Sequence, residues 1–303
     1  MKTTFVFDKL ISDFKNTSLA LGFFDGVHMG HQKVLNSAVD LSQKLGTKST
    51  VLTFKNHPIE ILYNVVPEFI TTYKERINLF KKIGFDAVVI PEFTKQLSLL
   101  SAQEYLEQVI LKFEPKSISV GYNHKFGCKQ SGTIEFLEQM SKKYNYILDV
   151  VAPVKNKNEV TSSTLIRNTI KQGDVSKAHK LLGKPYSITN TVIHGAKRGR
   201  LLNFPTANLE FPEKKIVPEF GVYAGIVTIG GKQYKAISNI GLRPTFGDIT
   251  IPLQEIHILD FSKDIYNETL TFEFLNKVRD EIKFSSFEKL KEQIKKDILA
   301  AKF

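Results

Sequence analysis

The sequence predicts a two-part chain: an N-terminal α/β part built on a doubly wound parallel sheet, then a small C-terminal β-barrel with a terminal helix. Two observations lead to this prediction. Up to about residue 152, apolar strand patterns alternate with amphipathic helix patterns, as in open parallel sheets. After residue 185 the rhythm changes to short strand-like runs separated by glycine and proline, which is typical of a barrel. We therefore expect domains at 1–184 and 185–303, with the boundary near 183–186.

The first part opens with expected strands at 17–24 and 48–54, which flank a helix beginning near Gly30. Its predicted buried face holds Val34, Ala38, Leu41 and Leu45. Such a β-α-β unit implies a parallel strand pair with a ligand at the carboxyl ends of the strands. The same patterns predict further strands at 87–90, 117–120 and 147–151, and helices at 73–83, 102–113, 133–144, 162–172 and 174–182.

The second part contains a series of short runs rich in β-branched and aromatic residues. They predict strands at 187–193, 222–229, 234–240, 255–259 and 269–274. An amphipathic helix over 287–301 follows. We expect it to present Leu290, Ile294, Ile298 and Leu299 to the barrel.

Composition limits the class of protein. Of 303 residues, 42% are hydrophobic, which is enough for packed cores. The single cysteine, Cys128, excludes a disulfide framework and suits a reducing cytoplasm. The first residues lack an apolar stretch typical of a signal peptide, and no run approaches the roughly 18 apolar residues of a membrane span. We expect a cytoplasmic protein.

The net charge of +11 predicts anionic partners. Nucleic acid would require a dense basic stripe with interleaved aromatic residues. Here the lysines are dispersed over helix faces, and the compact basic cluster is 197–200. We therefore expect small polyanions such as ATP and a phosphorylated cofactor, with no nucleic acid and no membrane as partners. The sequence carries no signal for an oligomeric state.

Residues 19–31, L-A-L-G-F-F-D-G-V-H-M-G-H, organise the first part. Glycines allow tight turns and close approach to a ligand. A helix that begins near Gly30 places free amides and a positive dipole end beside His28 and His31, which favours a polyphosphate. Since Gly30 places no side chain between the imidazoles, both rings can converge on one ligand. Two alternative interpretations of this histidine pair are two surface histidines at a turn and a zinc site with further ligands.

Three further polar stretches follow expected strands of the first part. Residues 53–58 contain His57, and residues 121–127 contain Asn123 and His124. Residues 161–167 contain Ser-Ser-Thr and an arginine, which can cap a helix or hold phosphates. Alone, each is also typical of an ordinary cap or a polar loop. Together, at the carboxyl ends of strands, they indicate a nucleotide site.

The second part contains two candidate chemical groups. A glycine-spaced basic loop at 195–200 can wrap phosphates with backbone amides, and Thr206 and Asn208 offer neutral oxygen ligands that suit magnesium. Glu255 shares a strand face with His257 and can accept a proton from an attacking hydroxyl. An ordinary turn and a surface glutamate at a strand start are the alternatives.

The first-part motifs resemble those of the bacterial bifunctional riboflavin kinase/FAD synthetase family: G-x-F-D-G-V-H-x-G-H, T-F-x-P-H-P, G-x-[ND]-[FY]-x-F-G and S-S-T-x-[IV]-R. The resemblance implies that the FMN phosphate attacks the α-phosphorus of ATP, giving FAD and pyrophosphate, with magnesium bridging phosphates. It implies flavin contacts at Asn123 and His57, and catalytic roles for His28 and His31. Asn56 and His124 depart from the family pattern, which has proline and an aromatic residue there. The implied ATP-binding residues are Gly22, Phe24, His28, His31, Ser163, Thr164 and Arg167.

The second-part motifs resemble those of the riboflavin kinase module, including G-F-P-T-A-N, G-V-Y-A-G and E-x-H-[IL]-L-D-F. The resemblance implies transfer of the ATP γ-phosphoryl group to the riboflavin 5′-hydroxyl. Thr206 and Asn208 would hold magnesium, Glu255 would be the general base, and Arg279 would lie near the flavin. Asn203 replaces the usual glycine. The implied nucleotide loop contains Gly195, Lys197, Arg198, Gly199 and Arg200.

The sequence thus predicts a two-module enzyme that converts riboflavin to FMN and FMN to FAD. One rival hypothesis is a nucleotidyltransferase that acts on a different phosphorylated acceptor, which leaves the second part unexplained. The other is a non-catalytic flavin- or RNA-binding protein, although the candidate residues His28, Arg167, Thr206, Asn208 and Glu255 are all present.

Overall fold

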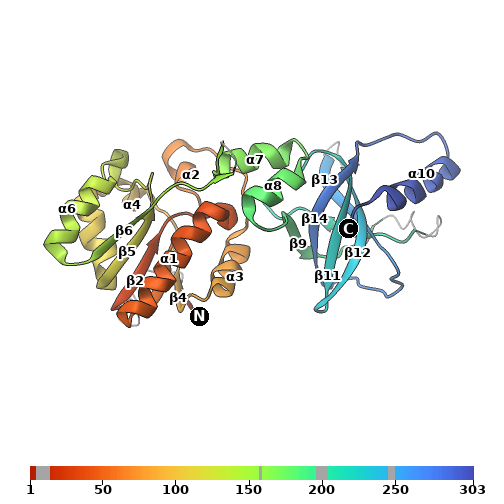
Figure 1. The fold of residues 1–303 in the computed structure, drawn as a ribbon. Coiled ribbons are helices and arrows are strands. Elements are labelled where there is room, and N and C mark those ends of the chain that lie inside the picture. Colours follow the sequence, from red (N-terminus) through yellow and green to blue (C-terminus); the bar gives the residue numbers. More distant parts are fainter. Residues whose placement is uncertain (5–13, 157–158, 196–203, 245–249) are drawn as a thin grey trace. The chain divides into compact units, whose positions relative to one another are not determined.

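The computed structural model describes residues 1–4, 14–156, 159–195, 204–244 and 250–303 (Figure 1). The chain divides into two compact units, Met1–Ser163 and Thr164–Phe303. Helices α7 (Ser163–Lys171) and α8 (Val175–Leu182) lie mostly in the second unit. This division precedes the predicted boundary because α8 packs on the barrel, where Ser176 Oγ donates to the Leu275 carbonyl oxygen at 3.0 Å.

The first unit is built on a six-stranded parallel sheet, as predicted, with the order β1-β4-β3-β2-β5-β6. The chain runs outward from β2 through β3 and β4, then returns to the other side of β2 with β5 and β6. The switch point therefore lies between β2 and β5, where open α/β sheets place their ligands. The strands are β1 (Lys2–Thr4), β2 (Thr17–Leu21), β3 (Lys48–Leu52), β4 (Ala87–Val89), β5 (Pro115–Gly121) and β6 (Ile147–Val151).

Helices cover both faces of this sheet. The predicted helix at 102–113 forms as one helical run whose middle is π-helical and whose end is 3₁₀. Two antiparallel strands of two residues each, β7 (Lys155–Asn156) and β8 (Glu159–Val160), follow β6. The helices are α1 (Met29–Leu45), α2 (Pro58–Tyr63), α3 (Tyr73–Ile83), α4 (Lys95–Leu99), α5 (Ala102–Tyr105), η3 (Leu106–Ile110), η4 (Leu111–Phe113), η5 (Cys128–Gln130) and α6 (Ile134–Tyr144).

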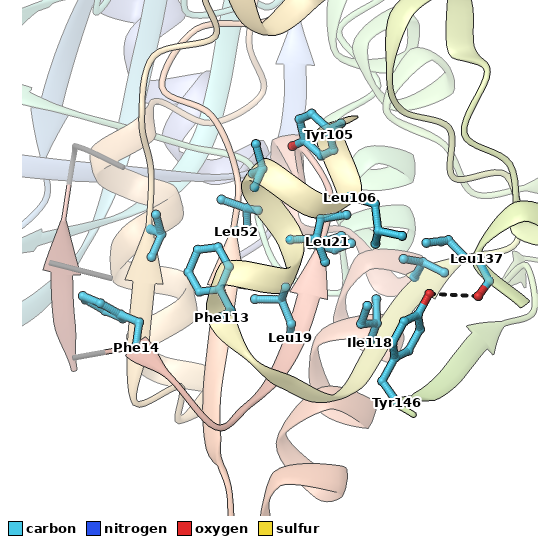
Figure 2. Close-up of a cluster of buried hydrophobic side chains, with 14 of the residues drawn as sticks. Phe14, Leu19, Leu21, Leu52, Tyr105, Leu106, Phe113, Ile118, Leu137 and Tyr146 are labelled. Atoms are coloured by element: carbon cyan, nitrogen blue, oxygen red, sulfur yellow. Dashed lines mark hydrogen bonds between the residues drawn. The ribbon is translucent and has the colours of Figure 1, made fainter. Parts of the chain in front are cut away.

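Strand alternation divides the core into two layers. Leu19 and Leu21 point into the layer under α6 and the 102–113 run, where the Tyr146 hydroxyl donates to the Leu137 carbonyl oxygen at 2.8 Å (Figure 2). Ala20 points into the opposite layer, which is filled from α1 and α3. Leu45, predicted on the buried face of α1, is 39% exposed. It is the last helical residue before the left-handed cap Gly46 and lies beyond the packed part of the helix.

The second unit is the predicted small barrel, an antiparallel six-stranded sheet with the order β10-β13-β12-β11-β14-β9. An isolated bridge between Ile193 and Asn208 brings the end of β9 beside β10 and nearly closes it. Strand β10 was not predicted as such. The strands are β9 (Ser187–Thr191), β10 (Ala207–Glu210), β11 (Gly221–Ile229), β12 (Lys232–Pro244), β13 (Thr250–Ile258) and β14 (Thr269–Arg279).

The terminal helix α10 (Phe287–Ala300) packs on the barrel through Ile298, which joins a cluster with Val222, Ala224 and Ile237. The prediction that Leu299 faces the barrel is wrong, because this side chain is 86% exposed. Adjacent helical residues point about 100° apart, so Leu299 cannot share the face of Ile298. Within the described residues, no helix has both the length and the apolar character to cross a membrane.

Candidate active sites

The turn after β2 brings the two motif histidines together at the start of α1. His28 is the N-cap, and its Nδ1 accepts a hydrogen bond from the His31 backbone N–H at 3.2 Å. The two imidazole rings stack, with centroids 3.5 Å apart. A Cβ on Gly30 would lie 3.1 Å from Cε1 of His28, so the glycine leaves room for this ring. The prediction that the helix begins beside both histidines is confirmed.

Phe24 packs against the His31 ring from the side of the core. It is 3% exposed, adopts left-handed backbone angles (φ 56°), and packs edge-on against the His31 ring. A Cβ on Gly22 would lie 2.8 Å from the Phe24 ring, which explains this glycine. The Phe24 side chain, which the resemblance placed at the ATP site, is thus part of the core beneath His31. The positive end of the α1 dipole lies at this turn and favours an anion there.

The loop after β3 lies against the same turn. Thr53 Oγ1 donates to the Phe23 carbonyl oxygen at 2.9 Å, and the ring of His57 lies edge-on to the Phe23 ring at 4.4 Å. His57 also caps α2 by accepting from the Ile59 backbone N–H. Asn56, which stands where the family pattern has proline, donates to the Phe93 carbonyl oxygen at 3.0 Å and accepts from the Phe93 N–H at 2.7 Å. Its amide therefore fastens this loop to the segment after β4.

The loop after β5 carries the two other residues predicted on the flavin side. Asn123 is exposed, with its Oδ1 3.5 Å from the position that a Cβ on Gly121 would occupy. His124 is half-buried and stacks on Phe126 with ring centroids 5.9 Å apart. Burial lowers the pKa of His124 to about 4, so the ring is neutral at pH 7. It therefore acts here as an uncharged ring, as an aromatic residue would.

His124 should make the first unit less stable in mild acid. Its pKa is lower in the folded than in the unfolded chain, so the unfolded chain binds the extra proton between about pH 6.5 and pH 4. Stability present above pH 6.5 is thus lost as the pH falls. We expect about 1–2 kcal/mol less stability at pH 5 than at pH 7 from this residue. Thermal unfolding of the wild type and of His124→Phe at both pH values measures this loss. If stability depends equally on pH in both proteins, the prediction is contradicted.

Ser163 connects the start of α7 to the histidine turn, because its Oγ donates to the Asp25 carbonyl oxygen at 3.1 Å. Asp25 belongs to the short 3₁₀ turn η2 (Asp25–Val27), directly before His28. Thr164 and Arg167, the other predicted phosphate ligands, follow on α7 and belong to the second unit.

In the second unit, three polar side chains form a row across neighbouring strands. Asn208 of β10 pairs with Glu255 of β13, and Glu255 pairs in turn with Asn239 of β12. Residues directly opposite in a ladder share a face, with Cβ atoms about 4.5–5.5 Å apart. Asn239 was not predicted, because a strand pattern does not reveal which residues face each other. Glu255 is an exposed residue.

The segment before β10 is fixed onto this row. A Cβ on Gly195 would lie 2.3 Å from Asn208 Nδ2, so the start of the predicted nucleotide loop passes directly over the Asn208 amide. Asn208 is 6% exposed, and Thr206 is half-buried. The Pro205 carbonyl oxygen lies 2.9 Å from His257 Nδ1. The other predicted loop residues, Lys197, Arg198, Gly199 and Arg200, lie outside the described residues.

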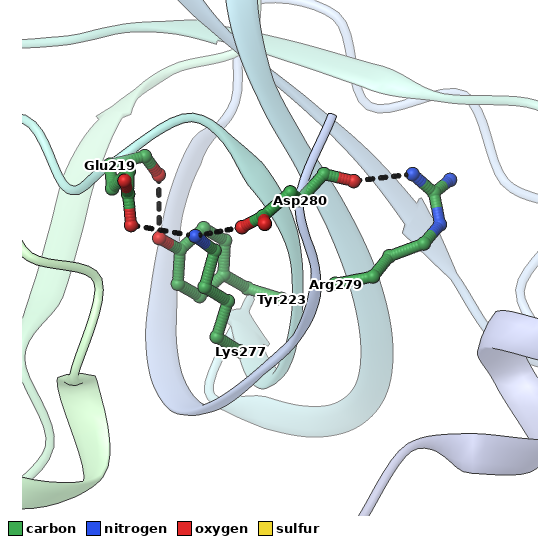
Figure 3. Close-up of polar contacts among 5 residues, drawn as sticks. All are labelled: Glu219, Tyr223, Lys277, Arg279 and Asp280. Carbon is green, nitrogen blue, oxygen red and sulfur yellow. Dashed lines mark hydrogen bonds and ion pairs between the residues drawn. The ribbon is translucent and has the colours of Figure 1, made fainter. Parts of the chain in front are cut away.

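Arg279 of β14 continues this row, because Val222 of β11 pairs with both Asn239 and Arg279. Its side chain is engaged by α10. Its Nη2 pairs with Asp297 Oδ2 at 2.9 Å, and Asp297 is 3% exposed. Its Nη1 donates to the Asp280 carbonyl oxygen at 2.8 Å, beside a cluster in which Lys277 pairs with Glu219 and Asp280 (Figure 3). A flavin contact by this guanidinium would therefore compete with Asp297.

The comparisons agree with this two-unit arrangement. Residues 10–165 match the family model described as FAD synthetase, and residues 182–303 match that described as riboflavin kinase. The chain is 34% identical to a bifunctional riboflavin kinase/FMN adenylyltransferase of Listeria monocytogenes, covering 93% of this chain and 90% of the relative. It is 36% identical to the protein of the same description from Haemophilus influenzae, covering 94% and 93%.

A solved structure is also similar over its whole length. It is titled a macrolide-efflux protein from Streptococcus pneumoniae, is 32% identical, and superposes with a TM-score of 0.90 over 99% of both chains.

Proposed function

The chain belongs to the family of bifunctional riboflavin kinases/FMN adenylyltransferases, and from that premise we infer how its residues divide the two reactions. The enzyme phosphorylates riboflavin to FMN and adenylylates FMN to FAD, with ATP as the second substrate of each step. The single observation that carries the residue assignment is the row of Asn208, Glu255 and Asn239 on one barrel face, separate in sequence from the histidine turn of the first unit.

The barrel row supplies the groups for phosphoryl transfer. The carboxylate of Glu255, an exposed residue, accepts the proton of the riboflavin 5′-hydroxyl as the hydroxyl oxygen bonds to the γ-phosphorus of ATP. The bond from that phosphorus to the β-phosphate oxygen breaks, and ADP leaves. Asn208 and Asn239 flank Glu255 on the two neighbouring strands. Gly195, which packs on the Asn208 amide, begins the loop that we assign to nucleotide binding.

Magnesium is part of this proposal. Thr206 and Asn208 are neutral oxygen donors that lie two residues apart at the start of β10, and the Gly195 backbone packs closely on the Asn208 amide. This donor set fits magnesium, which takes few protein ligands and completes its shell with phosphate oxygens and water. When bound, the ion neutralises charge on the transferring phosphoryl group.

Removing a metal ligand should raise the magnesium requirement of one reaction alone. For Thr206→Val, which keeps the shape of the side chain, and for Asn208→Ala, we expect half-maximal kinase activity to need about tenfold more magnesium. Steady-state rates at increasing magnesium measure this. FAD formation from FMN by the same variants is the internal control and should keep its magnesium dependence. An unchanged requirement in the kinase reaction would remove both residues from the metal site.

The first unit joins FMN to AMP by charge neutralisation and alignment. An oxygen of the FMN phosphate bonds to the α-phosphorus of ATP, and the bond to the departing pyrophosphate breaks. The attacking phosphate is already anionic, so no protein base is required. His28 and His31 donate to phosphate oxygens at the amino end of α1, and Ser163, which is held beside this turn, adds a hydroxyl. Asn123 and His57 contact the flavin; Phe24 supports the His31 ring.

Two further assignments complete the proposal. We place the functional boundary near 183–186, because we assign the motif that continues to Thr164 and Arg167 on α7 to the first reaction. The single cysteine suits the reducing cytoplasm, where we expect the enzyme to act.

A further inference from the structure

Arg76 is a buried charged residue that the sequence patterns did not single out. It lies in the first turn of α3 and is fully buried. Its guanidinium reaches past the helix to the loops at the carboxyl ends of β2 and β3. Nη1 donates to the Phe23 carbonyl oxygen at 2.6 Å, and Nη2 donates to the Phe54 and Lys55 carbonyl oxygens at 2.9 and 3.3 Å.

Thr53 joins the same contacts. Its Oγ1 lies 3.2 Å from Arg76 Nη1 and donates to the Phe23 carbonyl oxygen at 2.9 Å. The loop that carries His57 and the turn that carries His28 are therefore held to one rigid, planar group. A guanidinium suits this task because its donors point in fixed directions.

A second set of contacts ties the histidine turn to the segment before α3. Asp25 is 2% exposed and accepts from the Ile70 and Thr71 backbone N–H groups at 3.1 and 2.9 Å. Thr71 Oγ1 donates to Asp25 at 3.0 Å and accepts from the Gly26 N–H at 2.8 Å. The turn from Phe23 to Gly26 is thus held from two directions before the chain reaches His28.

The charge of Arg76 is kept despite its burial. Burial lowers its pKa to about 10, and the nearby Asp25 carboxylate opposes that shift, so the guanidinium is protonated at neutral pH. Its charge also lies over the Phe23 ring, 4.2 Å from the centroid. A charged group placed this deeply is costly unless it is well paired, and both Nη atoms of Arg76 donate to oxygens of the two loops.

We propose that Arg76 is a positioning residue for FMN adenylylation, which fixes the His28 turn against the His57 loop so that ATP and FMN meet in line. The inference rests on the proposed function of the first unit. Misplacing a reacting group by about 1 Å can lower a rate about 10²-fold, whereas substrate binding depends on contacts spread over a wider surface. Loss of Arg76 should therefore act on kcat more than on KM.

The test compares Arg76→Met with wild type and with Arg76→Lys. For Arg76→Met we expect kcat for FAD formation from FMN to fall about 30- to 100-fold, with KM for ATP changed less than about threefold. Arg76→Lys keeps the charge but replaces the planar fork with one ammonium, so it should recover only part of the rate. Hydrogen exchange of residues 22–28 should be faster in Arg76→Met. Riboflavin phosphorylation by the same protein should stay unchanged.

Phe113→Leu is the matched control for a general loss of stability. Phe113 is fully buried in the layer between the sheet and the 102–113 run, away from both loops. At equal folded fraction by circular dichroism, it should retain wild-type kcat. Under that condition, equal kcat values for Arg76→Met and Phe113→Leu would overturn the inference. The proposed function would still stand if the wild-type enzyme forms FAD from FMN. A wild-type enzyme that makes no FAD would instead overturn the function.

If Arg76→Met does not fold, Thr53→Val decides. This variant keeps the shape of the side chain and removes the hydroxyl that joins Arg76 to the Phe23 carbonyl oxygen. We expect its kcat for FAD formation to fall about three- to tenfold with an unchanged KM for ATP. A kcat equal to wild type would overturn the inference.

Discussion

Replacing Glu255 with Gln should lower the rate of FMN formation from riboflavin about 10²- to 10⁴-fold, the range typical of losing a general base. The amide has the size of the carboxylate but cannot take the proton of the 5′-hydroxyl. Because Glu255 is exposed and its neighbours Asn208 and Asn239 remain, the barrel should keep its stability. The measurement is steady-state FMN production with saturating ATP and magnesium.

The same variant should form FAD from supplied FMN within about twofold of wild type, since that reaction belongs to the other unit. Glu292→Gln is the matched control: it removes an exposed carboxylate from α10, away from the row. It should leave both reactions unchanged. Intact kinase activity in Glu255→Gln would withdraw the base assignment.

Replacing His28 with Ala should have the reverse pattern. We expect FAD formation from FMN to fall about 10²- to 10³-fold, as when one preorganised donor to a transition state is removed. Riboflavin phosphorylation should be unchanged. Chromatography of the flavin products measures both rates in one sample.

His28 also caps α1, so a second variant separates the two roles. Asparagine is a good N-cap residue, and loss of such a cap costs about 1 kcal/mol. His28→Asn should therefore restore the thermal stability that His28→Ala loses, yet remain as slow in FAD formation. Recovery of the rate by Asn would mean that the cap, and not the imidazole, matters to the reaction.

Much of the fold was predictable because local and tertiary signals agree. The run Leu19-Ala20-Leu21 is apolar on both faces, as a central parallel strand requires, and α1 begins beside the motif histidines as its sequence indicates. The edge strand β1 has three residues and takes its structure from pairing with β4. It is too short to show a strand pattern in the sequence. Leu299 was misplaced because hydrophobicity alone ignored the angle between adjacent helical side chains.

The site residues that belong to sequence motifs could be predicted. Those whose role depends on burial or on the register of paired strands could not. Arg76 stands among charged residues in K-E-R and reads as part of a solvated helix face, yet it is buried against carbonyl oxygens of two distant loops. Asn239 faces Glu255 only through the register of β12 and β13. Both depend on contacts between segments far apart in the chain, which a single sequence does not specify.

The central claim is that two separate sites in this chain carry out the two reactions in succession. Mixing the variants Glu255→Gln and His28→Ala tests it most directly, with riboflavin, ATP and magnesium as the only substrates supplied. Each variant alone should make almost no FAD, because one cannot form FMN and the other cannot use it. The equimolar mixture should produce FAD, as His28→Ala supplies FMN to the intact first unit of Glu255→Gln. A mixture that makes no more FAD than its separate components, although His28→Ala releases FMN, would contradict the account.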